Sequence, residues 1–300
     1  IFVLKNNKGT EDNRVRKLDY SIQLSKLFYE RFIKNEEITL FSPHDVPGLY
    51  DCFGTDVFDE LYVRYEQDES IPKTKVNGQE LILELLKERA ETGRIYIMNI
   101  DHCNSHSSFL DKVEMSNLCQ EITLPTKPIN HIDDKTGEIA LCILSAINIG
   151  KIRDVQDLEV LCDLSIRSLD ELIDFQGYPV NAAEIATRAR RSLGVGYIGL
   201  AHYLAKQGVK YEDPKAWKLV HDLTEGFQYY LIKASVNLAK EKGACEYSNR
   251  TKYAKGILPI DTYKKEVDEI VENDLSFDWG ALREELLEHG IRNSTLSAQM

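Results

Sequence analysis

The segment SNLCQEI, residues 116–122, places three chemically capable side chains at alternate positions: Asn117, Cys119 and Glu121. In an extended chain, residues i, i+2 and i+4 project to the same side, so the amide, the thiol and the carboxylate face one space. In a helix, Cys119 lies opposite the other two, and two prolines just downstream disfavour a helix. The sequence therefore predicts an extended row of three polar side chains in a loop.

The chemistry open to this row depends on its carboxylate. A negative charge near a thiol raises the thiol's pKa, so Glu121 does not help Cys119 to become a thiolate. A hydrolytic cysteine needs a histidine partner, which the row lacks. The three residue types suit a cysteine that stays neutral and exchanges a hydrogen atom while the carboxylate manages a proton. An ordinary loop cysteine is the alternative that the residues alone leave open.

A second cysteine lies in ALCILSAINIG, residues 140–150, an almost wholly apolar run. The run is typical of a buried strand or of a buried helix segment, because periodicity cannot separate the two. As a strand, it places Cys142 on a face with small residues that leave room beside the thiol. One face would hold Ile139, Leu141, Ile143 and Ile147. The other would hold Ala140, Cys142, Leu144 and Ala146. A buried core cysteine is the plain interpretation for this residue type.

Two further motifs suggest binding chemistry with weaker support. LGVGYIG, residues 193–199, fits the dinucleotide pattern G-x-G-x-x-G, yet a basic helical segment rather than a strand precedes it, so tight packing is preferred. DHCNSH offers His102, Cys103 and His106, which could join Cys119 as zinc ligands. Because this spacing matches no established ligand pairing, no metal site is predicted. A non-catalytic zinc or thiol-binding module is kept as the alternative function.

Composition narrows the class of protein. Hydrophobic residues make up 43% and charged residues 29% of the chain, which is typical of a soluble globular protein. The net charge of −12 argues against a surface that binds duplex nucleic acid. The longest apolar run, residues 139–149, is too short to span a bilayer, and the first residues do not resemble a signal peptide. Six scattered cysteines without a CxxC pair indicate a reducing compartment, the cytoplasm.

Helical and strand-like patterns alternate along the chain, which predicts an α/β fold with parallel strands. Pattern alone does not separate an open sheet from a closed barrel. Residues 101–130 are predicted to be one long loop with an extended central piece, and loops of that length are usually functional or disordered. Helices are predicted at 17–35, 79–92, 157–176, 214–242 and 279–289, and a further helix is predicted to begin at a capping box of Asn181 and Glu184. Strands are predicted at 37–41, 94–100 and 139–149.

Several stretches, in order along essentially the whole chain, resemble the large catalytic subunit of class I ribonucleoside-diphosphate reductase of the bacterial and bacteriophage aerobic type. They are FSPHDVPGLYD, TGRIYIMNIDHCNSH, SNLCQEITLPTKPIN, GEIALCILSAINIG, YAKGILPIDTYKK and RNSTLSAQM. The resemblance implies that the chain is part of one catalytic domain, a ten-stranded α/β barrel of two five-stranded parallel halves. The loop at about 101–130 would be its central finger.

The resemblance also implies roles for four residues. Cys119 would carry the transient thiyl radical that removes the 3′ hydrogen of a ribonucleoside diphosphate. Glu121 would take the proton of the 3′ hydroxyl, and Asn117 would hydrogen-bond the ribose hydroxyls. Cys142 would be one half of the dithiol that supplies two electrons.

Other expectations concern parts and partners beyond this sequence. The second dithiol cysteine and an ATP-binding module that receives ATP and dNTP effectors are expected upstream, and a phosphate loop and a C-terminal tail downstream. No cofactor is expected in this segment, since a diiron–tyrosyl radical would reside on a separate small subunit. That subunit, a second large subunit and thioredoxin or glutaredoxin are the expected partners, with no nucleic acid polymer and no membrane. The segment alone is expected to be inactive.

Overall fold

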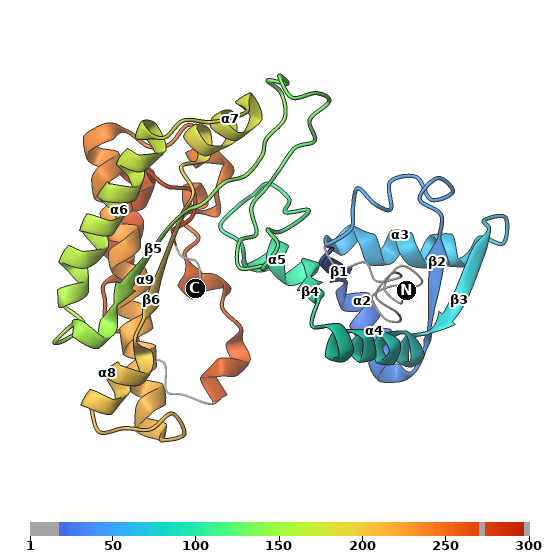
Figure 1. Ribbon diagram of the computed structural model, residues 1–300, viewed down its shortest axis with the longest axis horizontal. Helices are drawn as coiled ribbons and strands as arrows, with labels where there is room; N and C mark the ends of the chain where they lie inside the picture. The colour runs from blue at the N-terminus through green and yellow to red at the C-terminus, as the bar shows by residue number, and fades with distance from the viewer. Residues whose placement is uncertain (1–17, 270–273, 297–300) are drawn as a thin grey trace. The chain divides into compact units, whose positions relative to one another are not determined.

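The computed structural model describes residues 18–269 and 274–296, which divide into two compact units (Figure 1). The described part of the first unit covers residues 18–107 and 116–123. That of the second unit covers residues 108–115, 124–269 and 274–296. The loop that carries Cys119 is therefore divided, with its tip in the first unit and both of its arms in the second.

The first unit contains a parallel strand pair covered by two helices. Strand β1 (Tyr20–Leu24) pairs with β4 (Ile95–Asn99). Helices α2 (Lys26–Lys34) and α4 (Gly78–Thr92) contribute apolar side chains to the core beside this pair. The buried residues of this core are Leu24, Ile82, Leu85 and Ile95.

An antiparallel strand pair and two further helices complete the first unit. Strands β2 (Glu37–Phe41) and β3 (Lys73–Asn77) pair in antiparallel fashion, and α3 (Asp56–Gln67) lies between them in sequence. Helix α5 (Ile100–His106) follows β4 directly. A second small core consists of Val46, Leu49, Phe58 and Tyr62.

The sequence predicted the first unit unevenly. The strands at 37–41 and 94–100 and the helix at 79–92 are confirmed, and Gly93 ends that helix with a φ of 66°, where glycine is favoured. The helix predicted at 17–35 is wrong in its first half, because residues 20–24 form β1. Helix α2 begins only after Ser25, whose hydroxyl accepts a hydrogen bond from the N–H of Phe28.

The second unit is built on another parallel pair, β5 (Ile143–Asn148) with β6 (Leu193–Ile198). Two long helices, α6 (Asp157–Phe175) and α9 (Pro214–Lys242), run side by side and share one large core with these strands (Figure 1). The shorter helices are α7 (Asn181–Arg190), α8 (Leu200–Lys206), α10 (Pro259–Thr262) and α11 (Trp279–His289). The 3-10 turns are η2 (Ile149–Lys151), η3 (Ser248–Arg250), η4 (Lys252–Lys255) and η5 (Lys265–Glu269).

A further extended segment follows the free edge of β6. The N–H of Leu193 donates to the carbonyl of Thr295 and the N–H of Val195 donates to that of Leu296, each at 3.0 Å. Both partners advance in the same direction along the chain, as in parallel pairing. Residues 295–296 therefore lie beside β6 without forming an assigned third strand.

Most of the predicted elements of the second unit are confirmed. Helices α6, α9 and α11 agree with the predicted ranges to within a residue. On the predicted apolar stripe of α6, Leu158 and Cys162 are fully buried, but Leu172 is 45% exposed. The predicted capping box is wrong, because α7 has Val180 as its N-cap and the Asn181 side chain donates to the carbonyl of Asp133.

The fold class is α/β, as predicted, but no closed barrel is present among the described residues. Their strands form three two-stranded sheets, two parallel and one antiparallel. Among the same residues, no helix is both long and apolar enough to cross a bilayer. Residues 1–17, 270–273 and 297–300, which include the end of RNSTLSAQM, lie outside the described part of the chain.

Candidate functional site

Cys119 lies in a tight turn rather than in an extended strand. The N–H of Gln120 donates to the carbonyl of Asn117, and the N–H of Asn117 donates to the carbonyl of Ile122, each at 3.2 Å. Gln120 has a φ of 66°, in the left-handed region that non-glycine residues rarely adopt. The predicted extended row is therefore wrong, because the chain reverses here and exposes Cys119 at the turn.

The turn nevertheless brings two of the predicted side chains together. Asn117 Nδ2 donates to Glu121 Oε1 at 2.5 Å, and Asn117 Oδ1 accepts from the N–H of Ile122 at 3.1 Å. Both ends of the amide are thus engaged within the turn. Glu121 Oε2 is buried and has no hydrogen-bond partner among the described residues. Hydrogen bonding within the described residues therefore engages one oxygen of the carboxylate and not the other.

One anchor of the turn was missed by the sequence reasoning. Gln120 Nε2 donates to Ser21 Oγ of β1 at 2.7 Å, which ties the turn to the strand pair of the first unit. The amide can reach β1 because the backbone at Gln120 is left-handed. A glutamine beside a cysteine carries no sign of this conformation in the sequence, so the contact could not be predicted.

Cys142 belongs to the second unit and lies one residue before β5. The predicted strand is confirmed, although it begins at Ile143 rather than at 139. Its inner face is confirmed at Ile147, which is buried, whereas Leu141 on the same predicted face is 37% exposed. Cys142 is half-buried. By the alternation of side chains along a strand, it falls on the same side as Leu144.

The glycines of LGVGYIG shape the sheet face beside Cys142. Gly194 pairs with Leu144 and Gly196 pairs with Ala146 across the β5–β6 pair. Paired residues of adjacent strands project to the same side, so on this side β6 presents no side chain at either position. At these two positions the sheet face is therefore backbone only, and Leu144 of β5 is 41% exposed. The sequence prediction had noted the small residues of β5 but not this contribution from β6.

The same geometry removes the dinucleotide interpretation. Gly194 and Gly196 are buried inside β6, whereas a phosphate-binding glycine loop follows its strand. Gly199 begins α8 at a φ of 86°, and a Cβ there would lie 2.8 Å from Asn148 Oδ1. The motif therefore serves strand packing and a close turn, as predicted.

The alternative zinc module finds little support in DHCNSH. These residues form α5, where the rings of His102 and His106 lie edge to face at 5.7 Å. Burial raises the pKa of the Cys103 thiol, which disfavours the thiolate that binds metal. Within the described residues, the side chains grouped closely enough to hold a metal ion do not include this motif.

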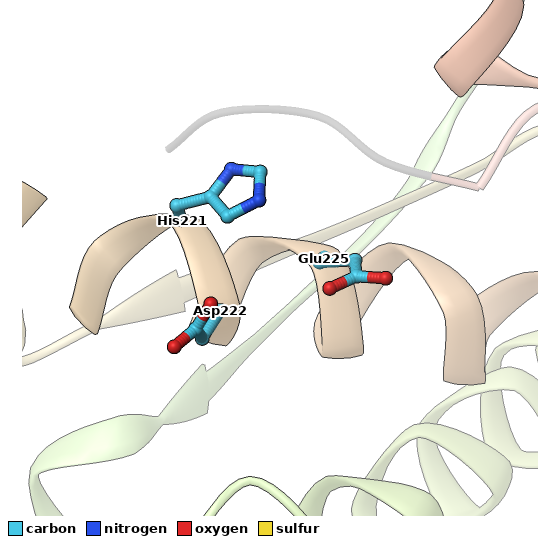
Figure 2. A group of neighbouring side chains, drawn as sticks. All are labelled: His221, Asp222 and Glu225. Carbon is cyan, nitrogen blue, oxygen red and sulfur yellow. The ribbon is translucent and has the colours of Figure 1, made fainter. Parts of the chain in front are cut away.

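That group lies on α9 and is drawn in Figure 2: His221, Asp222 and Glu225. Their ligand atoms lie within 4.8 Å of one another. Glu225 Oε1, however, already accepts from the N–H of Ser276 at 2.8 Å and from the indole N–H of Trp279 at 3.0 Å. Asp222 forms an ion pair with Lys218. Because both carboxylates are engaged, the group is better explained as a tether between α9 and the segment before α11.

Comparisons with known proteins agree over the whole chain. The family model of the ribonucleotide reductase barrel domain matches residues 1–300. The chain is 59% identical to the ribonucleoside-diphosphate reductase subunit alpha of Haemophilus influenzae and 56% identical to subunit alpha of reductase 1 of Escherichia coli. It is 47% identical to the subunit alpha of Enterobacteria phage T4. Each alignment covers 100% of this chain and 40% of the relative, so the chain spans about two fifths of their length.

Proposed function

The chain belongs to the family of the ribonucleotide reductase barrel domain, and we propose that it forms the catalytic segment of a ribonucleoside-diphosphate reductase large subunit. This enzyme reduces ribonucleoside diphosphates to 2′-deoxyribonucleoside diphosphates for DNA synthesis. The observation that carries the proposal is the turn 117–122. It presents an exposed cysteine beside an amide–carboxylate pair in which Glu121 Oε2 is buried without a partner among the described residues.

In the proposed reaction, Cys119 acts as a thiyl radical. Its sulfur takes the hydrogen atom from C3′ of the ribose, so an S–H bond forms as the C3′–H bond breaks. Glu121 accepts the proton of the 3′ hydroxyl, and Asn117 hydrogen-bonds the ribose hydroxyls. The 2.5 Å contact from Asn117 Nδ2 to Oε1 fixes the carboxylate and leaves Oε2, which has no partner among the described residues, as the proposed proton acceptor. A proton acceptor positioned in this way contributes about 10²–10⁴-fold to a rate.

The reduction itself consumes a dithiol. The 2′ hydroxyl leaves as water, and two thiols supply two electrons and two protons as they form a disulfide. Cys142 is one of these thiols. It is half-buried just before β5, and β6 contributes glycines rather than larger side chains to the same face of the sheet. Cys119 then returns its hydrogen atom to C3′ and becomes a radical again, and Glu121 returns its proton to the 3′ oxygen. Thioredoxin or glutaredoxin reduces the disulfide by thiol exchange and so prepares the next turnover.

The radical originates outside this chain in the proposal. A separate small subunit holds a diiron–tyrosyl radical, and ATP and dNTP effectors bind other parts of the full-length large subunit, which pairs with a second copy. The relatives' name, subunit alpha, supports an enzyme of several subunits. The net charge of −12 fits a cytoplasmic enzyme that binds nucleotides in a local pocket rather than a nucleic acid polymer or a membrane.

The architecture proposed for the complete domain is the ten-stranded α/β barrel. The parallel pairs β1–β4 and β5–β6 would belong to its two five-stranded halves, and residues 295–296 beside β6 extend one of them. Parallel strands joined by helices, as in both units, are the units from which such barrels are built. Residues 101–130 then form the finger, apart from α5 at its start.

An isotope competition tests the proposed reaction on the full-length subunit with its small subunit. A mixture of unlabelled and 3′-deuterated ribonucleoside diphosphate is offered at low conversion. If a thiyl radical removes the 3′ hydrogen, the unlabelled substrate is consumed faster. Equal consumption of both, or no deoxynucleotide from the wild-type enzyme, would overturn the proposal.

A further inference from the structure

A buried guanidinium in the second unit holds both arms of the loop that carries Cys119. Arg190 ends α7 and its side chain is 2% exposed. It donates from Nη1 to Asp111 Oδ2 at 3.0 Å and from Nε to Glu138 Oε2 at 2.9 Å. Asp111 lies on the arm that leads to Cys119, and Glu138 lies on the arm that returns from it. One side chain therefore joins the segment before Cys119 to the segment after it.

Two further cations reinforce the same two carboxylates. Arg250 Nε lies 2.8 Å from Asp111 Oδ2, and Lys127 Nζ lies 2.8 Å from Glu138 Oε1. Lys127 and Glu138 also exchange two backbone hydrogen bonds, at 3.0 and 3.1 Å, which close the returning arm on itself. Stability alone explains these five ionic groups poorly, because a buried ion pair is often no more stable than apolar residues of similar volume.

Aromatic rings surround the guanidinium and keep it in place. Its central carbon lies 5.1 Å from the ring centroid of Tyr247 and 5.8 Å from that of Phe109. Phe109 also forms a backbone bridge with Thr251. The arms are thus fixed by directional charge pairs at one point, whereas the tip is anchored separately through Gln120 and Ser21.

We infer that Arg190 is a positioning residue, which through Asp111 and Glu138 sets the geometry at which the loop presents Cys119. The inference rests on the proposed function of Cys119. Displacing a reacting group by about 1 Å can lower a rate by about 10²-fold, so a small relaxation of the arms is enough to affect turnover.

The test removes one arm from the clamp with Asp111→Asn, which keeps the size of the side chain and leaves Arg190 paired with Glu138. The matched control is Asp174→Asn. It breaks the 2.8 Å ion pair of the adjacent Arg191, which joins α6 to α7 and holds neither arm of the loop. Both variants are made in the full-length subunit and assayed with its small subunit.

We expect Asp111→Asn to lower kcat by about tenfold to a hundredfold, and to speed hydrogen exchange of the amides of residues 116–123. Asp174→Asn should change neither property. Rescue belongs to the same test, because Asp111→Glu restores the charge and should recover part of kcat. An Asp111→Asn enzyme with normal kcat and normal exchange in this segment overturns the inference. An inactive wild type overturns the proposed function instead, and the exchange measurement still tests the clamp.

Discussion

At the scale of the residue, the turn holds its amide and its carboxylate differently. Asn117 is held at both ends of its amide, and Glu121 is held at one oxygen only. The residue types SNLCQEI predicted that a thiol and a carboxylate act together, and the structure adds the contact between Asn117 and Glu121. Their arrangement was not predictable, since the reversal depends on a left-handed backbone at Gln120, and glutamine does not signal it.

Glu121→Gln separates the two functions of this carboxylate. The glutamine carbonyl can still accept the hydrogen bond from Asn117 Nδ2, so the turn should keep its shape. The amide cannot accept the substrate proton, and kcat should fall by about 10²–10⁴-fold while substrate binding changes little. Steady-state kinetics and equilibrium binding of the nucleoside diphosphate measure the two effects. A variant with normal kcat would show that Glu121 is not the proton acceptor.

The cysteines should differ in reactivity because their surroundings differ. Cys119 is exposed, whereas Cys162 and Cys245 are buried, and burial raises their pKa values to about 12 and about 11. The thiolate is the form that alkylating reagents attack. Iodoacetamide at pH 8 should therefore label Cys119 in the folded protein and spare the two buried thiols until denaturant is added. Peptide mass mapping measures this, and rapid labelling of Cys162 under native conditions contradicts the described core.

At the scale of the element, capped and strongly periodic segments were the predictable ones. Helix α9 begins at an Asp-Pro pair, ends before Gly243 and buries Leu223 and Leu231 completely on its stripe. Residues 20–24 were mistaken for helix because their apolar spacing fits either period, and the cap at Ser25 was not recognised. The ion pairs of the loop arms could not be predicted, because they join residues far apart in sequence.

The clamp on the loop arms should weaken in acid. Burial raises the pKa of Glu138, but hydrogen bonds from Lys127 and Arg190 outweigh it and hold this pKa below the ordinary value of 4.5. As pH falls, the unfolded chain takes up this proton first, so the stabilisation is present above pH 4.5 and is lost as pH falls through the lowered pKa.

Glu138→Gln measures this contribution. The difference in melting temperature between wild type and variant should be constant above pH 5 and should shrink below about pH 4. Glu184→Gln serves as the control, because Glu184 forms an exposed ion pair with Arg188 on α7. Its melting temperature should differ little from that of wild type at every pH. A Glu138→Gln difference that does not change with pH would contradict the role given to the charge.

At the scale of the whole molecule, the alternation of helical and strand-like patterns predicted the α/β class. It did not predict whether the strands close into a barrel. The described strands form three two-stranded sheets, and the open edges of these pairs require further strands to become a barrel. A chain that spans about two fifths of its relatives should therefore lack turnover by itself. Mixed with the small subunit, substrate and a dithiol, the 300-residue chain should yield no deoxynucleotide, whereas the full-length subunit should. Product from the chain alone would show that closure is not needed.

The most direct test of the central claim compares Cys119→Ser with wild type in the full-length subunit, assayed with its small subunit and thioredoxin. Serine preserves the size of the side chain, but its O–H bond is too strong to serve as the hydrogen-atom carrier. Cys103→Ser, a half-buried cysteine of α5 without a role in the account, is the control. If Cys119 carries the radical, we expect Cys119→Ser to fold and bind substrate but to form no deoxynucleotide, while Cys103→Ser remains active. Deoxynucleotide formation by Cys119→Ser would contradict it.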